Sequence, residues 1–136
     1  METGHLFVYG TLMSAASGRL GGAERERLQR QGECLGAATI AGRLYDLGSY
    51  PGLVASNDAA DVVHGEVYAL RDAAQSLRWL DAYEGIAPGD HNGNEYERAV
   101  RPVRLASGSE LTAWVYLYVR DPATARLLSD GRWPGT

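Results

Sequence analysis

The sequence predicts an α+β fold in which a barrel-like or strongly curved sheet is combined with a few short helices. The observation that points to a curved sheet is the segment 110–119, where aliphatic residues alternate with threonine and aromatic residues. A strand that is apolar on one face and aromatic on the other suits a small barrel or a curved sheet with a pocket. The other expected elements are strands at 5–8, 34–44, 62–70 and 96–105, a clear helix at 72–85, and shorter helices at 23–31 and from residue 121 or 122 to 128.

Local features support the weaker of these elements. Helix formers fill 23–31, and Gly32 stands where a C-terminal cap is expected. Small and β-branched residues dominate 34–44, and Gly42 is the position where we expect this strand to bend. Pro102 restricts the strand at 96–105 to an edge or a bulge, because proline cannot donate to a ladder.

Composition indicates a soluble globular protein without a dense basic cluster. The 136 residues predict a single domain over 1–136, and the 45% hydrophobic and 22% charged residues are ordinary values for a soluble protein. All thirteen basic residues are arginine, and the net charge is −4. Arg25, Arg27 and Arg30 alternate with Glu24 and Glu26, which indicates a solvated helix face. Nucleic acid is therefore disfavoured as a main partner.

The single cysteine and the hydropathy pattern indicate where in the cell the protein is expected. One cysteine, Cys34, excludes an internal disulfide, and no stretch approaches the ~20 apolar residues of a membrane span. The first residues also lack the pattern of a secretory signal. We expect a cytoplasmic protein without a membrane partner, in which Cys34 is a small packing residue; the oligomeric state is open.

The first expected strand ends in a turn that can bind an anion. His5–Val8 is followed by Tyr9-Gly10-Thr11-Leu12, where Gly10 is free to adopt a positive φ and Thr11 can hydrogen-bond nearby backbone. Successive amides in such a turn can point the same way and hold a carboxylate or a developing oxyanion. Most glycine turns at strand ends bind nothing, so a purely structural turn is the alternative.

The helix at 72–85 places a carboxylate on its apolar side. Asp72 with Gln75 forms a capping-box pattern, and the apolar face, extended by one step, reaches Glu84 just before Gly85. Burial and the negative end of the helix both raise the pKa of a carboxyl there, which suits a general acid or base. Glu84 could instead fray outward, and Asp81 lies near the same face and could take either role.

Two loops are candidates for the edge of a pocket. Gly48, Pro51 and Gly52 predict a tight reversal, whose Tyr50 could line a pocket or cover the core. The polar segment 86–95 is expected to be a mobile flap over whatever Glu84 faces. It mimics the start of a calcium loop but lacks that motif's glycine and final glutamate, and the three histidines of the chain are isolated, so neither metal nor cofactor is expected.

The ordered set of motifs resembles the gamma-glutamylcyclotransferase-like family, and within it the branch of gamma-glutamylamine cyclotransferases and plant avirulence-induced proteins. The motifs are Tyr9-Gly10-Thr11-Leu12, Gly42-Arg43-Leu44-Tyr45-Asp46-Leu47-Gly48 with Tyr50-Pro51-Gly52-Leu53, His64-Gly65-Glu66-Val67-Tyr68, Leu80-Asp81-Ala82-Tyr83-Glu84-Gly85, Tyr96-Glu97-Arg98 and Trp114-Val115-Tyr116. Each motif alone is weak, but the ordered set is specific and covers nearly the whole chain.

The resemblance implies a compact, barrel-like mixed sheet with a central cavity. It also implies that backbone groups of Tyr9, Gly10, Thr11 and Leu12 bind the glutamyl part of a substrate and that Glu84 is the general acid and base. Three further residues match positions that line the cavity in the family: Tyr50, Tyr96 and Tyr116.

The implied reaction, a transferase- or lyase-type cyclisation, converts a small γ-glutamyl amide to 5-oxoproline and releases an amine, without metal or cofactor. Two alternatives stay open: a non-enzymatic small-molecule binding module on the same scaffold, and removal of a γ-glutamyl protecting group from a biosynthetic intermediate. The sequence indicates neither which amine leaves nor whether the turn binds the carboxylate or the oxyanion.

Overall fold

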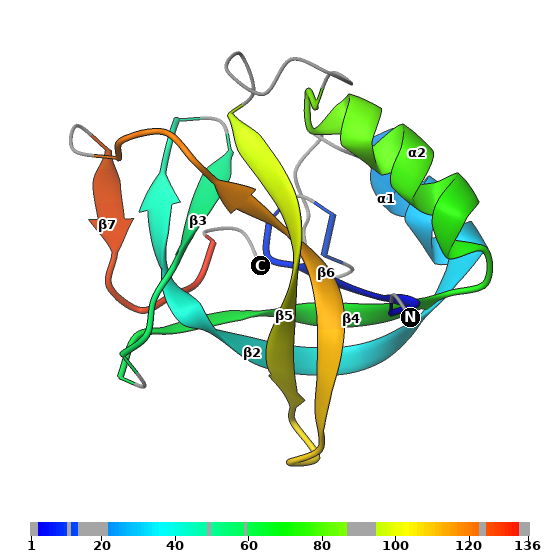
Figure 1. Ribbon diagram of the computed structural model, residues 1–136, viewed down its shortest axis with the longest axis horizontal. Helices are drawn as coiled ribbons and strands as arrows, with labels where there is room; N and C mark the ends of the chain where they lie inside the picture. The colour runs from blue at the N-terminus through cyan, green and yellow to red at the C-terminus, as the bar shows by residue number, and fades with distance from the viewer. Residues whose placement is uncertain are drawn as a thin grey trace.

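Five strands close into a barrel in the computed structural model, which describes residues 3–10, 12–13, 22–48, 50–58, 60–86, 95–122 and 125–133. The barrel strands are β1 (His5–Val8), β2 (Gly32–Asp46), β4 (Val62–Leu70), β5 (Tyr96–Leu105) and β6 (Glu110–Tyr118). Their order is β2-β4-β1-β6-β5, and β5 returns to β2 to close the ring (Figure 1). Only the β1–β6 pair among these is parallel, so the expected barrel-like mixed sheet is confirmed.

Strand β2 is long enough to serve two parts of the sheet. Residues 32–41 pair with β4 inside the barrel, whereas 42–46 continue beyond it and pair with β3 (Pro51–Ala55). The expected bend lies elsewhere than Gly42: the register shifts between Cys34 and Gly36, where Gly36 has a φ of 107°. Gly42 is instead a site of close approach, because a Cβ there would lie 2.9 Å from the Val54 carbonyl oxygen.

The prediction of a helix from residue 121 or 122 to 128 is wrong. Residues Arg126–Leu128 form a short strand, β7, which pairs antiparallel with residues 44–46 of β2. Leu128 is buried in the same apolar cluster as Leu44 and Leu53. The free edge of β2 therefore provides backbone partners that a helix of this length could not match.

Alternation along the strands produces two apolar clusters, one on each side of the sheet. The first includes Phe7, Val67 and Val115, whereas their sequence neighbours belong to the second. The second cluster consists of Leu6, Val8, Leu12, Met13, Leu28, Tyr68, Leu77, Leu80, Tyr96 and Tyr116, with several partly buried side chains packed against it. Since both faces of the sheet are covered here, Tyr116 on the aromatic face of β6 is buried, and Trp114 and Tyr118 beside it are partly buried.

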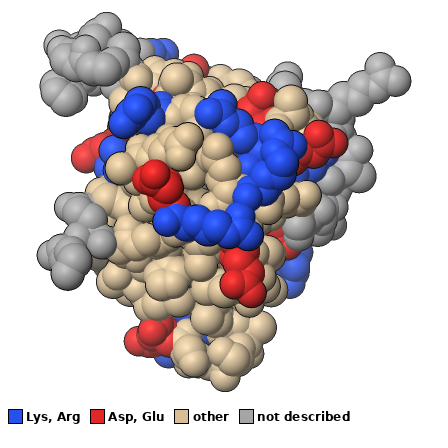
Figure 2. All heavy atoms as spheres, turned by 90° about the vertical axis from the view of Figure 1, so that its right-hand side faces the viewer, with Lys and Arg blue, Asp and Glu red and all other residues tan. Residues whose placement is uncertain are grey.

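Two helices cover the second cluster. They are α1 (Gly22–Gln31) and α2 (Ala73–Tyr83), whose residues Leu28, Leu77 and Leu80 are buried against the sheet. The Gln31 side-chain oxygen joins them by accepting hydrogen bonds from the Ser76 hydroxyl (2.8 Å) and the Trp79 indole (2.7 Å). Basic and acidic side chains are interspersed on the face that carries these helices (Figure 2). Neither described helix combines the length and apolarity that crossing a membrane requires.

The single cysteine does not fill the core. Cys34 is exposed on β2, so its interpretation as a packing residue is wrong. The bulge that follows it explains the exposure, because an inserted residue changes which side chains face the core.

A close contact at Gly65 of β4 holds the end of β1 in place. A Cβ at Gly65 would lie 2.2 Å from the Val8 carbonyl oxygen and 2.6 Å from the Phe7 ring. No side chain fits in that space, so only glycine lets β1 approach β4 at this level. The residues that follow Val8 line the cavity described below, and this contact therefore fixes one wall of it.

We predict that Gly65→Ala lowers the free energy of unfolding by about 3 kcal/mol or more, because backbone atoms of β1 must move to admit the methyl group. Denaturant unfolding measures the loss. The control is Gly4→Ala, where the nearest atom would be 3.9 Å away; its effect should stay within about 0.5 kcal/mol. Equal effects of the two substitutions would contradict the close contact.

Candidate active site

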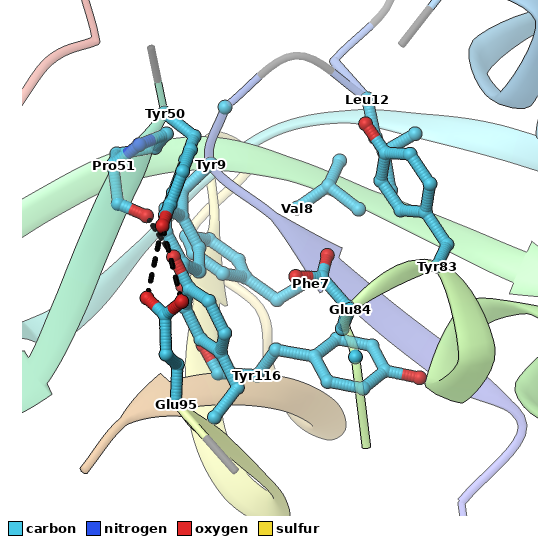
Figure 3. A pocket seen from close by; sticks show the side chains of 13 residues that line it. Phe7, Val8, Tyr9, Leu12, Tyr50, Pro51, Tyr83, Glu84, Glu95 and Tyr116 are labelled. Carbon is cyan, nitrogen blue, oxygen red and sulfur yellow. Dashed lines mark hydrogen bonds between the residues drawn. The ribbon is translucent and has the colours of Figure 1, made fainter. Parts of the chain in front are cut away.

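A cavity of about 380 Å³ lies where the ends of several elements meet. β1 contributes its last residues and the turn after it, β3 and β5 their first residues, α2 its C-terminal end, and β6 one tyrosine. The lining residues are Phe7, Val8, Tyr9, Gly10, Leu12, Tyr50, Pro51, Tyr83, Glu84, Gly85, Glu95, Tyr96 and Tyr116 (Figure 3). Such a volume suits a small ligand that is mostly enclosed.

The end of α2 fixes the position of Glu84. The Glu84 amide donates to the Leu80 carbonyl at 2.9 Å, Gly85 to Ala82 at 3.1 Å, and Ile86 to Asp81 at 2.9 Å. With a φ of 76° at Gly85, these bonds form a Schellman motif. Glu84 is thus the capping residue of an ordered helix end and does not fray. Its side chain reaches into the cavity (Figure 3).

The surroundings of Glu84 favour its protonated form. Burial raises the pKa of this carboxyl, and the negative charge of Asp81 raises it further, to about 7. The C-terminal end of a helix also disfavours an anion. A carboxyl with this pKa exists in both forms near neutral pH, as proton transfer in both directions requires.

Asp81 has a different environment, which separates the roles of the two carboxylates. It accepts two hydrogen bonds from the Arg98 guanidinium, at 2.8 and 3.2 Å, and one from the Tyr116 hydroxyl at 2.7 Å. Arg98 in turn lies over the Trp114 ring, 4.3 Å from its centroid. Because its oxygens are engaged and it is absent from the cavity lining, Asp81 acts on the site through its charge.

Three buried tyrosines line the cavity together with Glu84. Burial is the largest cause that raises the pKa of Tyr9, Tyr96 and Tyr116, and the charge of Glu84 contributes in each case. All three are therefore neutral phenols. Tyr9 donates to the Tyr116 carbonyl and Tyr96 to the Pro51 carbonyl. Glu84 is thus the lining group best suited to exchange a proton near pH 7.

The glycine of the first turn is required for a different reason than the sequence suggests. Gly10 does not have a positive φ. A Cβ there would lie 2.8 Å from Cγ of Pro51, so the glycine allows β3 to pack against the turn. The Gly10 carbonyl accepts a hydrogen bond from the Met13 amide at 3.1 Å, which closes the turn over residues 10–13.

The structure brings almost all the expected site residues to one cavity. Tyr9, Gly10, Leu12, Tyr50, Glu84, Tyr96 and Tyr116 all line it. Thr11 lies outside the described residues, as do residues 87–94 of the expected flap. Among the described residues, no group of three or more His, Cys, Asp or Glu side chains could hold a metal ion.

Sequence reasoning missed three lining residues with polar or shape-determining roles. Tyr83 precedes Glu84 in a quoted motif, so its proximity to the site could have been inferred. Pro51 was recognised only as a turn residue, and its contact with Gly10 is long-range. Glu95 lay within a segment interpreted as a polar flap, and its place in the cavity depends on its pairing with Tyr50, which no local pattern reveals.

Comparison with known proteins identifies the family of the chain. A family model described as "Gamma-glutamyl cyclotransferase, AIG2-like" matches residues 6–135. The chain belongs to this family. One relative, named gamma-L-glutamyl-butirosin B gamma-glutamyl cyclotransferase from Niallia circulans, is 34% identical over 128 residues, which cover 93% of this chain and 74% of that protein.

Two further proteins that resemble this chain have solved structures. YtfP of Escherichia coli is 37% identical over 91 residues, or 67% of this chain and 66% of that protein. Its solution structure superimposes with a TM-score of 0.61 at 30% identity, covering 96% of both chains. YkqA of Bacillus subtilis gives a TM-score of 0.67 at 22% identity, and this likeness shows the fold alone. The match covers 97% of the present chain but only 40% of YkqA.

We predict that Glu84→Gln stabilises the folded protein in mildly alkaline solution. The folded-state pKa of Glu84, about 7, exceeds the ordinary 4.5, so the folded state holds this proton more tightly than the unfolded state. Ionisation therefore removes stability as the pH rises through this interval, by up to about 3 kcal/mol. Denaturant unfolding of both proteins should show no difference near pH 4 and a gain for Glu84→Gln near pH 8. A loss at both pH values would contradict the buried, strained carboxyl.

Removal of the charge on Asp81 should bring the Glu84 pKa closer to its ordinary value. We predict that Asp81→Asn lowers the Glu84 pKa below about 7, because the second cause of its elevation is gone. Carbon-13 NMR titration of the Glu84 carboxyl measures the change directly. Glu97→Gln, which removes an exposed carboxylate of β5, is the matched control and should leave the titration unaltered. An unchanged midpoint in Asp81→Asn would show that burial acts alone.

Proposed function

We propose that this family member converts a γ-glutamyl amide to 5-oxoproline and releases the amine. The observation that carries the proposal is one carboxyl, Glu84, with a pKa of about 7 on the wall of the cavity. Membership of the γ-glutamyl cyclotransferase family supports the same reaction.

The reaction needs one group that first accepts and then donates a proton. The Glu84 carboxylate takes a proton from the α-ammonium of the glutamyl part. The free amine then attacks the γ-carbonyl carbon of the same molecule, which forms the ring C–N bond and a tetrahedral oxyanion. Collapse of this intermediate breaks the bond to the leaving nitrogen, and the Glu84 carboxyl returns the proton to it. The ring nitrogen loses its extra proton to water, so the products are 5-oxoproline and the free amine. Atoms balance without a nucleophile from the protein.

The cavity assists this sequence in two ways. It holds the glutamyl chain in a bent conformation, so that the reacting nitrogen and carbon are close before the chemical step. The Tyr9–Leu12 turn supplies backbone amides for the α-carboxylate or for the oxyanion. The hydroxyls of Tyr9 and Tyr96 already donate to backbone carbonyls, which supports a role as rigid walls for these rings.

We predict that the purified protein releases 5-oxoproline from at least one member of a panel of γ-glutamyl amides. The panel contains γ-glutamyl amino acids, γ-glutamyl amines and γ-glutamyl-butirosin B, and liquid chromatography detects the product. Glu84→Gln should lower kcat/KM by about a hundredfold or more, because an amide cannot transfer the proton. In the native protein kcat/KM should rise with pH and level off above about 7, as Glu84 ionises.

Two controls accompany this assay. Glu97→Gln, on the exposed side of β5, should retain the native rate, and a chelator should leave the rate unchanged. Inhibition by the chelator would contradict the metal-free mechanism. Binding of panel members without any product would instead favour a non-enzymatic binding module, and loss of folding in Glu84→Gln would make that residue structural.

A further inference from the structure

The mouth of the cavity carries a second carboxylate. Glu95 precedes β5 and lies with Tyr50 on one side of the cavity, while Tyr83 lies on the other and Glu84 between them (Figure 3). Among the described residues that line the cavity, two are acidic and none is arginine or histidine. The wall that a substrate meets is therefore negative and aromatic.

The position of Glu95 is fixed from two directions. The Tyr50 hydroxyl donates to both Glu95 carboxylate oxygens, at 2.9 and 3.2 Å. The Glu95 carbonyl accepts from the Val119 amide at 2.8 Å, next to the barrel. The hydrogen bond that the Tyr50 hydroxyl donates to Glu95 is the largest cause that raises the pKa of Tyr50, so Tyr50 stays a hydrogen-bond donor. The carboxylate is thus held in place before any ligand enters.

Aromatic rings surround the space between the two carboxylates. Tyr96 lies 6.4 Å from Tyr50 between ring centroids, and its phenol is affected by the charges of both Glu84 and Glu95. Tyr50 and Tyr83 are 37% and 36% exposed, so their rings are accessible at the mouth. Aromatic faces and a carboxylate together attract an ammonium group.

We propose that the leaving amine carries a positive charge of its own, so that the substrate is a γ-glutamyl conjugate of a diamine or polyamine whose distal ammonium binds at Glu95 beside Tyr50. This inference rests on the proposed function. If Glu84 receives the α-ammonium, the leaving group extends toward the mouth. A γ-glutamyl amino acid would bring its own carboxylate there, against Glu95.

Among the described residues, Arg120 is a basic residue near this mouth. Arg120 is close enough to Tyr50 for its charge to lower the pKa of that phenol, against the larger effects of Glu95 and burial. It is not among the lining residues of the cavity. The group that faces the ligand at this point is therefore the carboxylate.

The test compares three conjugates with four-carbon chains that end in a cationic, a neutral and an anionic group: γ-glutamyl-diaminobutane, γ-glutamyl-butylamine and γ-glutamyl-aminobutyrate. We expect kcat/KM to be highest for the diaminobutane conjugate, about tenfold above the neutral one, and lowest for the anionic one. Equal values, or a preference for the anionic conjugate, would overturn the inference while leaving the cyclisation intact.

A variant then assigns the preference to Glu95. Glu95→Gln should reduce the ratio of kcat/KM for the diaminobutane conjugate to that for the butylamine conjugate by about tenfold. Glu97→Gln, two residues further along the same chain, removes an equal charge outside the cavity and should keep the native ratio. A ratio that survives Glu95→Gln overturns the assignment.

Binding separates failure of this inference from failure of the proposed function. If none of the conjugates is turned over, the cyclisation proposal fails, and calorimetry with the same three compounds decides the inference. The inference is supported if the cationic conjugate binds most tightly, the neutral one less tightly and the anionic one least. In Glu95→Gln the difference in affinity between the cationic and the neutral conjugate should be lost. Any other order contradicts it.

Discussion

The cavity depends on one unfavourable arrangement: a half-buried carboxyl held at the negative end of a helix and close to a second carboxylate. Glu84 would relieve this cost by turning outward, but the Schellman motif at Gly85 fixes its backbone and the apolar cluster beneath α2 fixes the helix. The free energy comes from the rest of the molecule, chiefly from the two apolar clusters. A strained proton site is thus supported by ordinary packing at a distance.

Closure of the sheet makes this support possible. Because β5 pairs back to β2, the ends of β1, β3 and β5 meet at the same place as the end of α2. Each element supplies only one or two lining residues, and none of them forms the cavity alone. The Arg98–Asp81–Tyr116 chain of hydrogen bonds ties α2 to β5 and β6, so the helix end and the barrel keep a constant separation.

Features that depend on local chemistry could be predicted from the sequence, and those that depend on distant contacts could not. Helical spacing and Gly85 sufficed to place Glu84 on the buried face, and alternation sufficed to recognise the strands. The real need for glycine at position 10 comes from Pro51, forty-one residues away, and β7 exists because the edge of β2 is free. Glu95 required knowledge of its contact with Tyr50, which only the folded chain reveals.

The position of β1 has a consequence for how the protein is made. Its two neighbours in the barrel, β4 and β6, begin only at residues 62 and 110, so β1 leaves the ribosome well before either of its sheet partners has been made. Pairings between such distant segments are slow to form. The apolar strand β1 therefore stays unpaired, with its backbone hydrogen-bonding groups open, during much of synthesis. The cavity at its end is among the last parts of the molecule to be assembled.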